Sequence, residues 1–397
     1  MTGKVEKEPT RIPDANALRL RSSRRPRVLR GHPWVFAGEV EKLLPEAING
    51  AGVDLRTARD TELGSGVYNG RSQIVWRRYS AAAGVAFDAA YIAQAIDRAL
   101  LRREQEPFRR VVWSEADDLP GLIVDQFEDV LVVQALTLAV DQRLDRIGEI
   151  LVERCGPSEI VYRSDAPSRN HEGLTAEVRT RSGQSFDPRI FEIDGIEFRL
   201  DLSGGQKTGF YLDQRIQHHR VASYANGRRV LDGFCHIGGF ALRCARMGAA
   251  SVLGIDSSGQ CIEDARAHAD RNRLRAKFLC ANMFDFFTEY RGELFDLIVL
   301  DPPSFARNRA SLAGALRGYK QLNLRAMKNL AEGGLLATYS CSQHVSREEF
   351  MKMVSAAAAD ARRTVNVVEL TSQPPDHPVC LHFPESEYLK GAILEVR

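Results

Sequence analysis

Residues 339–345 read YSCSQHV and place a cysteine directly after a run of strand-forming residues. Cys341 ends the run LLATYSC and comes shortly before a predicted helix over residues 346–360. A thiol at such a place is either a packed side chain or a nucleophile that faces a bound substrate. The chemistry of the neighbouring strand ends distinguishes these two alternatives.

A carboxylate ends the preceding apolar run, FDLIVLD, and the sequence continues as PPSF. Asp301 is therefore expected at the edge of a buried strand. Pro302 and Pro303 keep the next residues in a stiff, non-helical conformation, and Phe305 follows within stacking reach of a flat base. A rigid loop with no chemical role is the alternative interpretation.

Two further carboxylates and an asparagine end earlier apolar runs. Asp232 opens the stretch DGFCHIGGF, Asp256 ends SVLGID, and Asn282 ends KFLCAN. The adjacent glycines 238 and 239 let a ligand approach the backbone at the start of a helix. The spacing is not Gly-x-Gly-x-x-Gly, so a dinucleotide is a poor fit.

Ligands of doubly wound sheets bind beyond the carboxyl ends of the strands. An acidic site there suits a ribose joined to a cationic amino-acid part, as in S-adenosyl-L-methionine. Helix capping is the alternative for each acid taken singly. The stretch GQKTGFYLDQR at 205–215 is expected to cover the cofactor as a flap, or else only to start a helix. The predicted cofactor-binding residues are Tyr211, Arg215, Asp232, Phe234, Gly238, Asp256, Ser257, Asn282 and Asp301.

The elements that must position these residues alternate regularly from about residue 190 onward. Apolar runs such as LIVL and LLATY are followed by segments with helical periodicity, including CIEDARAHADRN and SREEFMKMVSAAAAD. Runs that are apolar on both faces are typical of parallel strands covered by helices. The pattern predicts a doubly wound α/β domain over 190–397.

The first half of the chain has a different pattern. Residues 1–15 are polar and are expected to form a disordered tail. Short strand-like runs, which include Val28-Leu29 and Ile74-Val75-Trp76, predict a small β-rich domain over 16–86. A helix after Asp88, then strands and one more helix, predict a central α+β domain over 87–189.

Composition excludes several classes of protein. No apolar run reaches the roughly 18 residues of a membrane helix, and the polar start lacks the apolar core of a signal peptide. A cytoplasmic protein is therefore expected. The seven cysteines include no Cys-x-x-Cys pair, so neither a disulfide framework nor a metal site is predicted.

The net charge of +2 does not predict a nucleic-acid partner, but its distribution favours one. Residues 1–33 hold 9 Lys and Arg against 3 Asp and Glu. Arginine binds phosphate oxygens bidentately and gains from counterion release; a solvated tail is the alternative. The predicted RNA-binding residues are Arg21, Arg24, Arg25, Arg27, Lys207, Phe305 and Arg307.

Together with FPESEYLKG and the N-terminal stretch RLRSSRRPRVLRGHPWVFAGEV, these motifs carry a family resemblance over nearly the whole chain. The chain resembles the bacterial methyltransferases that make 5-methylcytosine in 23S ribosomal RNA. The resemblance implies a PUA domain, a central α+β domain and a class I Rossmann-like methyltransferase domain. It also implies ribosomal RNA as partner, and it leaves open whether two copies form a homodimer. His236-Ile237 and Asn282 depart from the family pattern, where Tyr-Thr and Asp are usual.

The resemblance assigns the thiol a role. Cys341 would add to C6 of a cytosine, and Asp301 would support N3, so that C5 becomes nucleophilic enough to accept a methyl group. Cys235, in the cofactor loop, is the rival thiol. Two other functions remain open: N-methylation of an exocyclic base amine, with Cys341 as a spectator, and a catalytically silent RNA-binding assembly factor.

Overall fold

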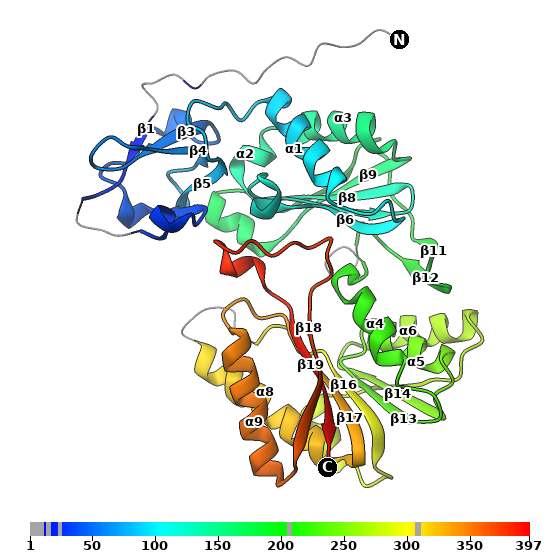
Figure 1. Cartoon of the computed structure of the whole chain (residues 1–397). Helices are drawn as coiled ribbons and strands as arrows, with labels where there is room; N and C mark the ends of the chain where they lie inside the picture. Colours follow the sequence, from blue (N-terminus) through cyan, green and yellow to red (C-terminus); the bar gives the residue numbers. More distant parts are fainter. Residues whose placement is uncertain (1–11, 13–16, 23–25, 205–208, 306–310) are drawn as a thin grey trace. The chain divides into compact units, whose positions relative to one another are not determined.

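The computed structural model describes residues 12, 17–22, 26–204, 209–305 and 311–397 (Figure 1). Arg24, Arg25, Lys207 and Arg307 lie outside the described residues, as does the predicted tail except for Ile12. Ile12 is buried, and its backbone N–H donates to the carbonyl of Gly84 at 3.0 Å. This residue therefore packs on the folded chain, although the sequence placed it in the tail.

The described chain divides into two compact units. One contains the chain up to Arg189 together with Leu200–Leu212 and Pro375–Ser386. The other contains Ile190–Arg199, Asp213–Pro374 and Glu387–Arg397. The first unit thus also includes two segments from the range 190–397.

The second unit is built on a seven-stranded sheet with the spatial order β15-β14-β13-β16-β17-β19-β18. The strands from β15 to β17 pair in parallel, and β19 is antiparallel to both of its neighbours. The order reverses between β13 and β16, which is where doubly wound sheets bind ligands. The strands are β13 (Arg229–Gly233), β14 (Ser251–Asp256), β15 (Lys277–Cys280), β16 (Phe295–Leu300), β17 (Leu330–Ser340), β18 (Val365–Ser372) and β19 (Lys390–Val396).

Helices cover both faces of this sheet (Figure 1). One face carries α4 (Arg215–Ala222), α5 (Gly239–Arg246) and α6 (Gly259–Arg271). The other carries α7 (Met283–Glu289), α8 (Leu312–Lys328) and α9 (Arg347–Ala361), whose apolar side chains share one core with Ile298, Leu336 and Leu394. Because the middle strands are covered on both sides, their sequences are apolar at nearly every position.

The first unit contains two five-stranded sheets. The β-rich part has the order β1-β3-β4-β5-β2, and the α+β part has the order β10-β9-β8-β7-β6 beneath α1 (Ala89–Leu101), α2 (Leu138–Asp141) and α3 (Leu144–Cys155). The strands are β1 (Ala17–Arg19), β2 (Trp34–Phe36), β3 (Gly52–Arg56), β4 (Glu62–Tyr68), β5 (Ile74–Ser80), β6 (Phe108–Trp113), β7 (Leu122–Phe127), β8 (Val130–Ala135), β9 (Glu159–Ser164) and β10 (Glu177–Thr180).

Local signals explain where some of these elements start. Asp88 caps α1 by accepting from the backbone N–H of Tyr91, as the sequence predicted. The expected strand at Val28-Leu29 is wrong: Arg27–Arg30 form a 3-10 helix that ends at Gly31 with φ 90°. A short pair of strands, β11 (Arg189–Ile193) and β12 (Ile196–Leu200), leads into the second unit.

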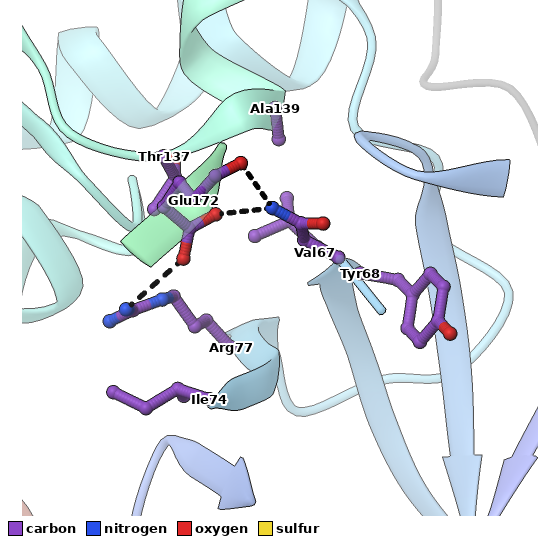
Figure 2. A pocket seen from close by; sticks show the side chains of 8 residues that line it. Val67, Tyr68, Ile74, Arg77, Thr137, Ala139 and Glu172 are labelled. Atoms are coloured by element: carbon purple, nitrogen blue, oxygen red, sulfur yellow. Dashed lines mark hydrogen bonds and ion pairs between the residues drawn. The ribbon is translucent and has the colours of Figure 1, made fainter. Parts of the chain in front are cut away.

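A buried glutamate joins the two sheets of the first unit (Figure 2). Glu172 accepts from the side-chain amide of Asn69 at 2.9 Å and pairs with Arg77 at 3.5 Å. The cavity beside them has about 10 Å³ of room for water. That volume suits a single water molecule and is far too small for a cofactor, so this junction is structural.

The segment Pro375–Ser386 packs against residues far from it in sequence. The backbone N–H of Arg110 donates to Asp376 at 2.8 Å, and the ring of Phe383 meets that of Trp34 at 4.8 Å. Glu385 pairs with Arg27 at 2.6 Å and with His32 at 3.0 Å. These contacts explain why the segment belongs to the first unit although β18 and β19 flank it.

No helix in the described ranges has the length and apolar character needed to cross a membrane. Within the same ranges, no group of three or more His, Cys, Asp or Glu side chains is arranged to hold a metal ion.

Candidate active site

Three predicted residues lie at one edge of the seven-stranded sheet because the strand register brings them there. Gly233 pairs with Leu300 across β13 and β16, and Leu300 pairs with Thr338 across β16 and β17. Asp232 is the next-to-last residue of β13, and Asp301 and Cys341 directly follow the ends of β16 and β17. The backbone N–H of Asp301 lies 3.4 Å from the carbonyl of Gly233.

Asp232 is fully buried beneath this edge. Its Oδ2 accepts from the backbone N–H of Ala241 at 2.9 Å, while Oδ1 has no hydrogen-bond partner within the described structure. Burial raises its pKa well above the usual range, and the nearby carboxylates of Asp301 and Asp256 raise it further. A cationic ligand would relieve this crowding of acids and could occupy the bare oxygen.

The loop from β13 to α5 has an unusual backbone. Phe234 and His236 adopt positive φ angles of 66° and 49°, which are uncommon for residues other than glycine. Gly238 has φ 94° and caps α5. A Cβ on Gly239 would lie 2.6 Å from the ring of His218, so the helix start and α4 can pack only with glycine there. The loop is thus held tightly around the edge of the sheet.

Asp256 and Ser257 lie where β14 ends. The carboxylate of Asp256 accepts from the backbone N–H of His236 at 3.0 Å and from that of Ser258 at 2.9 Å. Each oxygen keeps a further lone pair for a ribose hydroxyl. The side chain of Ser257 is exposed to solvent.

Asn282 follows β15 and is exposed. Its side-chain oxygen accepts from the backbone N–H of Phe284 at 2.8 Å and so caps α7. A contact of this oxygen with the bound cofactor would have to use its second lone pair. The capping alternative weighed for the strand-end residues therefore does apply at this position.

The thiol of Cys341 is half-buried, and its Sγ lies 3.9 Å from the carbonyl oxygen of Pro302. It is thus beside the loop that follows Asp301. The rival thiol differs: Cys235 is 4% exposed, and burial raises its pKa well above the usual range, with Asp232 and Asp256 adding to the effect. A thiol that resists ionisation is a poor nucleophile, so Cys235 is unsuited to that role.

A chain of hydroxyl groups supports the loop of Asp301. Ser342 Oγ lies 2.9 Å from Ser304 Oγ and 2.8 Å from the phenol oxygen of Tyr319. The ring of Phe305 packs on that of Tyr319, with centroids 4.6 Å apart. Phe305, expected to stack on a base, is therefore half-buried against the protein.

Lys390 is a residue that the sequence analysis did not select. It is 1% exposed and donates from Nζ to the carbonyl oxygen of Ser342 at 2.8 Å. A lysine opening the apolar run GAILEV could have drawn attention, because lysine is rarely buried without a partner.

Two residues of the predicted flap, Tyr211 and Arg215, belong to different units. Tyr211 is half-buried and belongs to the first unit. Arg215, a predicted cofactor-binding residue, pairs with Asp194, at 2.7 Å from Nη2. Half-burial raises the pKa of Asp194, but the hydrogen bonds from Arg215 and His219 outweigh this and bring it to about 2.

Two of the predicted RNA-binding arginines contact the protein itself. Arg21 donates from Nε to the carbonyl oxygen of Val40 at 2.6 Å, and Arg27 pairs with Glu385. Both remain exposed at the surface of the β-rich part. Their charges are partly used within the fold, which the sequence alone did not indicate.

Comparison with known proteins agrees with this architecture. Residues 175–383 match a family model described as S-adenosylmethionine-dependent methyltransferase, and residues 18–81 match a PUA-like domain. A solved structure of a Streptococcus mutans protein, assigned to the S-adenosylmethionine-dependent methyltransferases, has a TM-score of 0.81 at 20% identity. The alignment covers 96% of this chain and 99% of that one, which shows the shared fold.

Curated relatives are similar over almost their whole length. The ribosomal RNA large subunit methyltransferase I of Aeromonas hydrophila is 37% identical over 383 residues, covering 93% of this chain and 96% of its own. The protein of the same name from Shewanella amazonensis is 37% identical over 391 residues, covering 96% and 99%. The chain therefore belongs to the ribosomal RNA large subunit methyltransferase I family of S-adenosylmethionine-dependent methyltransferases.

Proposed function

We propose that this chain methylates C5 of a cytosine in large-subunit ribosomal RNA, with Cys341 as the covalent nucleophile. The observation that carries the proposal is the half-buried thiol 3.9 Å from the Pro302 carbonyl, at the same sheet edge as Asp232 and Asp301. The relatives named as ribosomal RNA methyltransferases support the class of substrate.

The acids at the strand ends fit the cofactor. Asp232 offers an unpaired buried oxygen, Asp256 keeps lone pairs for ribose hydroxyls, and Gly238 opens the backbone at the start of α5. When bound, S-adenosyl-L-methionine supplies an electrophilic methyl group. Phe234, Ser257, Asn282, Tyr211 and Arg215 are proposed as further contributors to this site.

The residues of this chain would prepare the cytosine to accept that methyl group. The Cys341 thiolate bonds to C6, and the electron pair of the C5–C6 double bond moves toward C5 while Asp301, in its protonated form, supports N3. After C5 has gained the methyl group, a base removes the C5 proton. The electron pair left at C5 re-forms the C5–C6 double bond while the C6–S bond breaks, and its electrons leave on sulfur as the regenerated thiolate.

The first unit would hold the RNA. Its PUA-like domain carries the exposed Arg21 and Arg27, and Arg24 and Arg25 belong to the same domain. Lys207 of the first unit, and Phe305 and Arg307 of the second unit, are further proposed contacts. A substrate that belongs to the ribosome implies action in the cytoplasm. A homodimer is compatible with this function and is not required by it.

The experiment is methylation of large-subunit RNA by the Cys341→Ala variant, read by bisulfite sequencing. Turnover should fall at least about a thousandfold, because a nucleophile has been removed. Cys280→Ala is the matched control, since Cys280 is exposed in the same unit and should retain full activity. Full activity of Cys341→Ala would instead favour methylation of an exocyclic amine. Calorimetric cofactor binding without turnover on any ribosomal RNA would favour the silent assembly factor.

A further inference from the structure

Lys390 begins β19, where its backbone pairs with Ser340 of β17 in the antiparallel ladder. Its side chain is buried, and Nζ donates to the carbonyl oxygen of Ser342 at 2.8 Å. The lysine is thus tied to the residue before Cys341 through the sheet and to the residue after it through its ammonium group. This arrangement fixes the backbone from which the thiol projects.

A buried ammonium needs a compensating negative charge or a full set of hydrogen bonds. Among the described residues, Lys390 makes one hydrogen bond, to Ser342, and no ion pair. Ammonium groups have three N–H donors, so the observed bond uses only one of them. The ammonium therefore lies where a further anion would stabilise it.

The charged groups around Lys390 come from three elements. Glu387 precedes it on its own segment, Arg347 and Glu349 come from α9, and Cys341 follows β17. Glu387 is already paired with Arg347 at 2.7 Å, and Glu349 accepts from the backbone N–H of Ser346 at 2.8 Å.

Two further titratable groups belong to this part of the sheet edge: Tyr319 of α8, which lies near Cys341, and Asp301, which follows β16. Burial raises the pKa of the Tyr319 phenol, which therefore stays neutral near neutral pH. Asp301 is next to Pro302, whose carbonyl meets the Cys341 sulfur. Because Glu387 is paired with Arg347, a thiolate at Cys341, the residue before the Ser342 carbonyl that Lys390 holds, is the further anion that this site can offer the ammonium.

We propose that Lys390 is a positioning residue that holds Cys341 in place and stabilises it as a thiolate. This inference rests on the proposed function, in which Cys341 is the nucleophile. The ammonium lowers the free energy of the ionised sulfur, as cations do for reactive cysteines elsewhere. It acts on the thiol and need not touch the RNA.

The ammonium can supply its charge under working conditions. Burial lowers the pKa of Lys390 to about 8, against smaller raising effects of Glu387 and Cys341. It is therefore mostly protonated at pH 7 and loses its charge as the pH rises through about 8. The stabilisation of the thiolate should be present at neutral pH and decline as pH rises through that value.

The test is the pH dependence of alkylation of the full-length protein by iodoacetamide, without RNA, read peptide by peptide by mass spectrometry. In Lys390→Met the alkylation rate of Cys341 at pH 7 should fall about tenfold, with its midpoint about one unit higher. Lys390→Arg should restore most of the rate. Lys352→Met is the control, because Lys352 is exposed on α9 and pairs with Glu348. The exposed Cys280 is an internal standard whose rate should not change.

An unchanged midpoint in Lys390→Met would overturn the inference, whatever its RNA methylation activity. A purely structural role would lower the midpoint of thermal unfolding and leave the alkylation profile of the folded protein in place. The proposed function fails separately, through an active Cys341→Ala variant. A shifted profile would then still show that Lys390 governs the thiol, without a role in catalysis.

Discussion

Asp232 is a buried carboxyl group whose ionisation is opposed by burial and by two neighbouring acids. One oxygen caps α5 through Ala241, and the other has no partner within the part of the chain described. Such an arrangement weakens a protein unless a ligand compensates it. The burial of the Asp232 carboxyl group is therefore better explained by a role in binding a cation than by a role in stabilising the fold.

The Asp232→Asn variant separates these two explanations. The amide oxygen can still accept from Ala241, so the free energy of unfolding should change by less than about 1 kcal/mol. The dissociation constant for S-adenosyl-L-methionine, measured by calorimetry, should rise about tenfold or more. Asp285→Asn, at an exposed position of α7, should alter neither quantity. Unchanged cofactor affinity in Asp232→Asn would contradict the assignment.

The loop at the sheet edge is held in place by two helices, α4 and α5, which pack closely against each other. The ring of His218 meets that of Phe240 at 4.4 Å and lies against the backbone of Gly239. This packing keeps the loop from Phe234 to Gly238 in its strained conformation. Two predictions follow from the close approach of α4 to α5, one steric and one dependent on pH.

Gly239→Ala would place a methyl group 2.6 Å from the His218 ring, where the backbone and helix leave little room to move. The unfolding free energy should fall by about 1–3 kcal/mol, and cofactor affinity should weaken with it. Gly259→Ala at the start of α6 is the matched control, since nothing lies within 4 Å of its added Cβ. Equal stability of the two variants, measured by urea unfolding, would refute this view of the helix contact.

Burial lowers the pKa of His218 to about 3, with the charge of Arg243 adding to the effect. In the unfolded chain the pKa of this histidine has its ordinary value of 6.5. Between about pH 3 and pH 6.5, His218 therefore binds a proton in the unfolded chain but not in the folded one. Stability is therefore lost as pH falls from 6.5 toward 3, by about 1.4 kcal/mol per unit for this residue. His218→Gln should remove that part of the slope in denaturant titrations, and the exposed His344→Gln should not. If the unfolding free energy of His218→Gln kept the same dependence on pH, the ring would be in contact with water and able to bind a proton in the folded protein, which would contradict this prediction.

Many of the helices and strands could be predicted from the sequence. The apolar runs that end at Asp256 and Asp301 coincide with β14 and β16, because parallel strands covered on both faces need apolar residues at most positions. Short strands with polar or glycine-containing sequences, such as β1, β3 and β10, carry no such signal and were not predicted. Lys390 was overlooked for a related reason, since its burial depends on the pairing of β19 with β17.

The whole molecule is assembled by contacts between segments that are remote in the chain. The domain order and the methyltransferase fold could be predicted from motifs and periodicity. The return of Pro375–Ser386 to the first unit could not, because it depends on pairs such as Glu385 with Arg27 and His32. No local pattern in the sequence encodes a contact across more than 350 residues.

Glu385→Gln tests how much that segment stabilises the first unit. Burial raises the pKa of Glu385, but the hydrogen bonds from His32 and Arg27 outweigh this and bring it to about 2. The ionised form thus stabilises the fold above pH 4.5, and this is lost as pH falls toward 2. After allowance for partial exposure, the variant should lose about 1–2 kcal/mol at neutral pH. This loss of stability should appear as faster hydrogen exchange in peptides that contain β2. Glu41→Gln, at an exposed position, is the control. Equal exchange in both variants would show that the segment is only loosely held.

The most direct test of the central claim uses RNA that carries 5-fluorocytosine at the target position. Fluorine at C5 cannot leave as a proton does, so a cytosine bonded to a cysteine and then methylated should remain attached. With cofactor present, the protein should form a complex stable to denaturation, and its RNA-bearing peptide should contain Cys341. Absence of such a complex, attachment through another residue, or its persistence in Cys341→Ala would contradict the account.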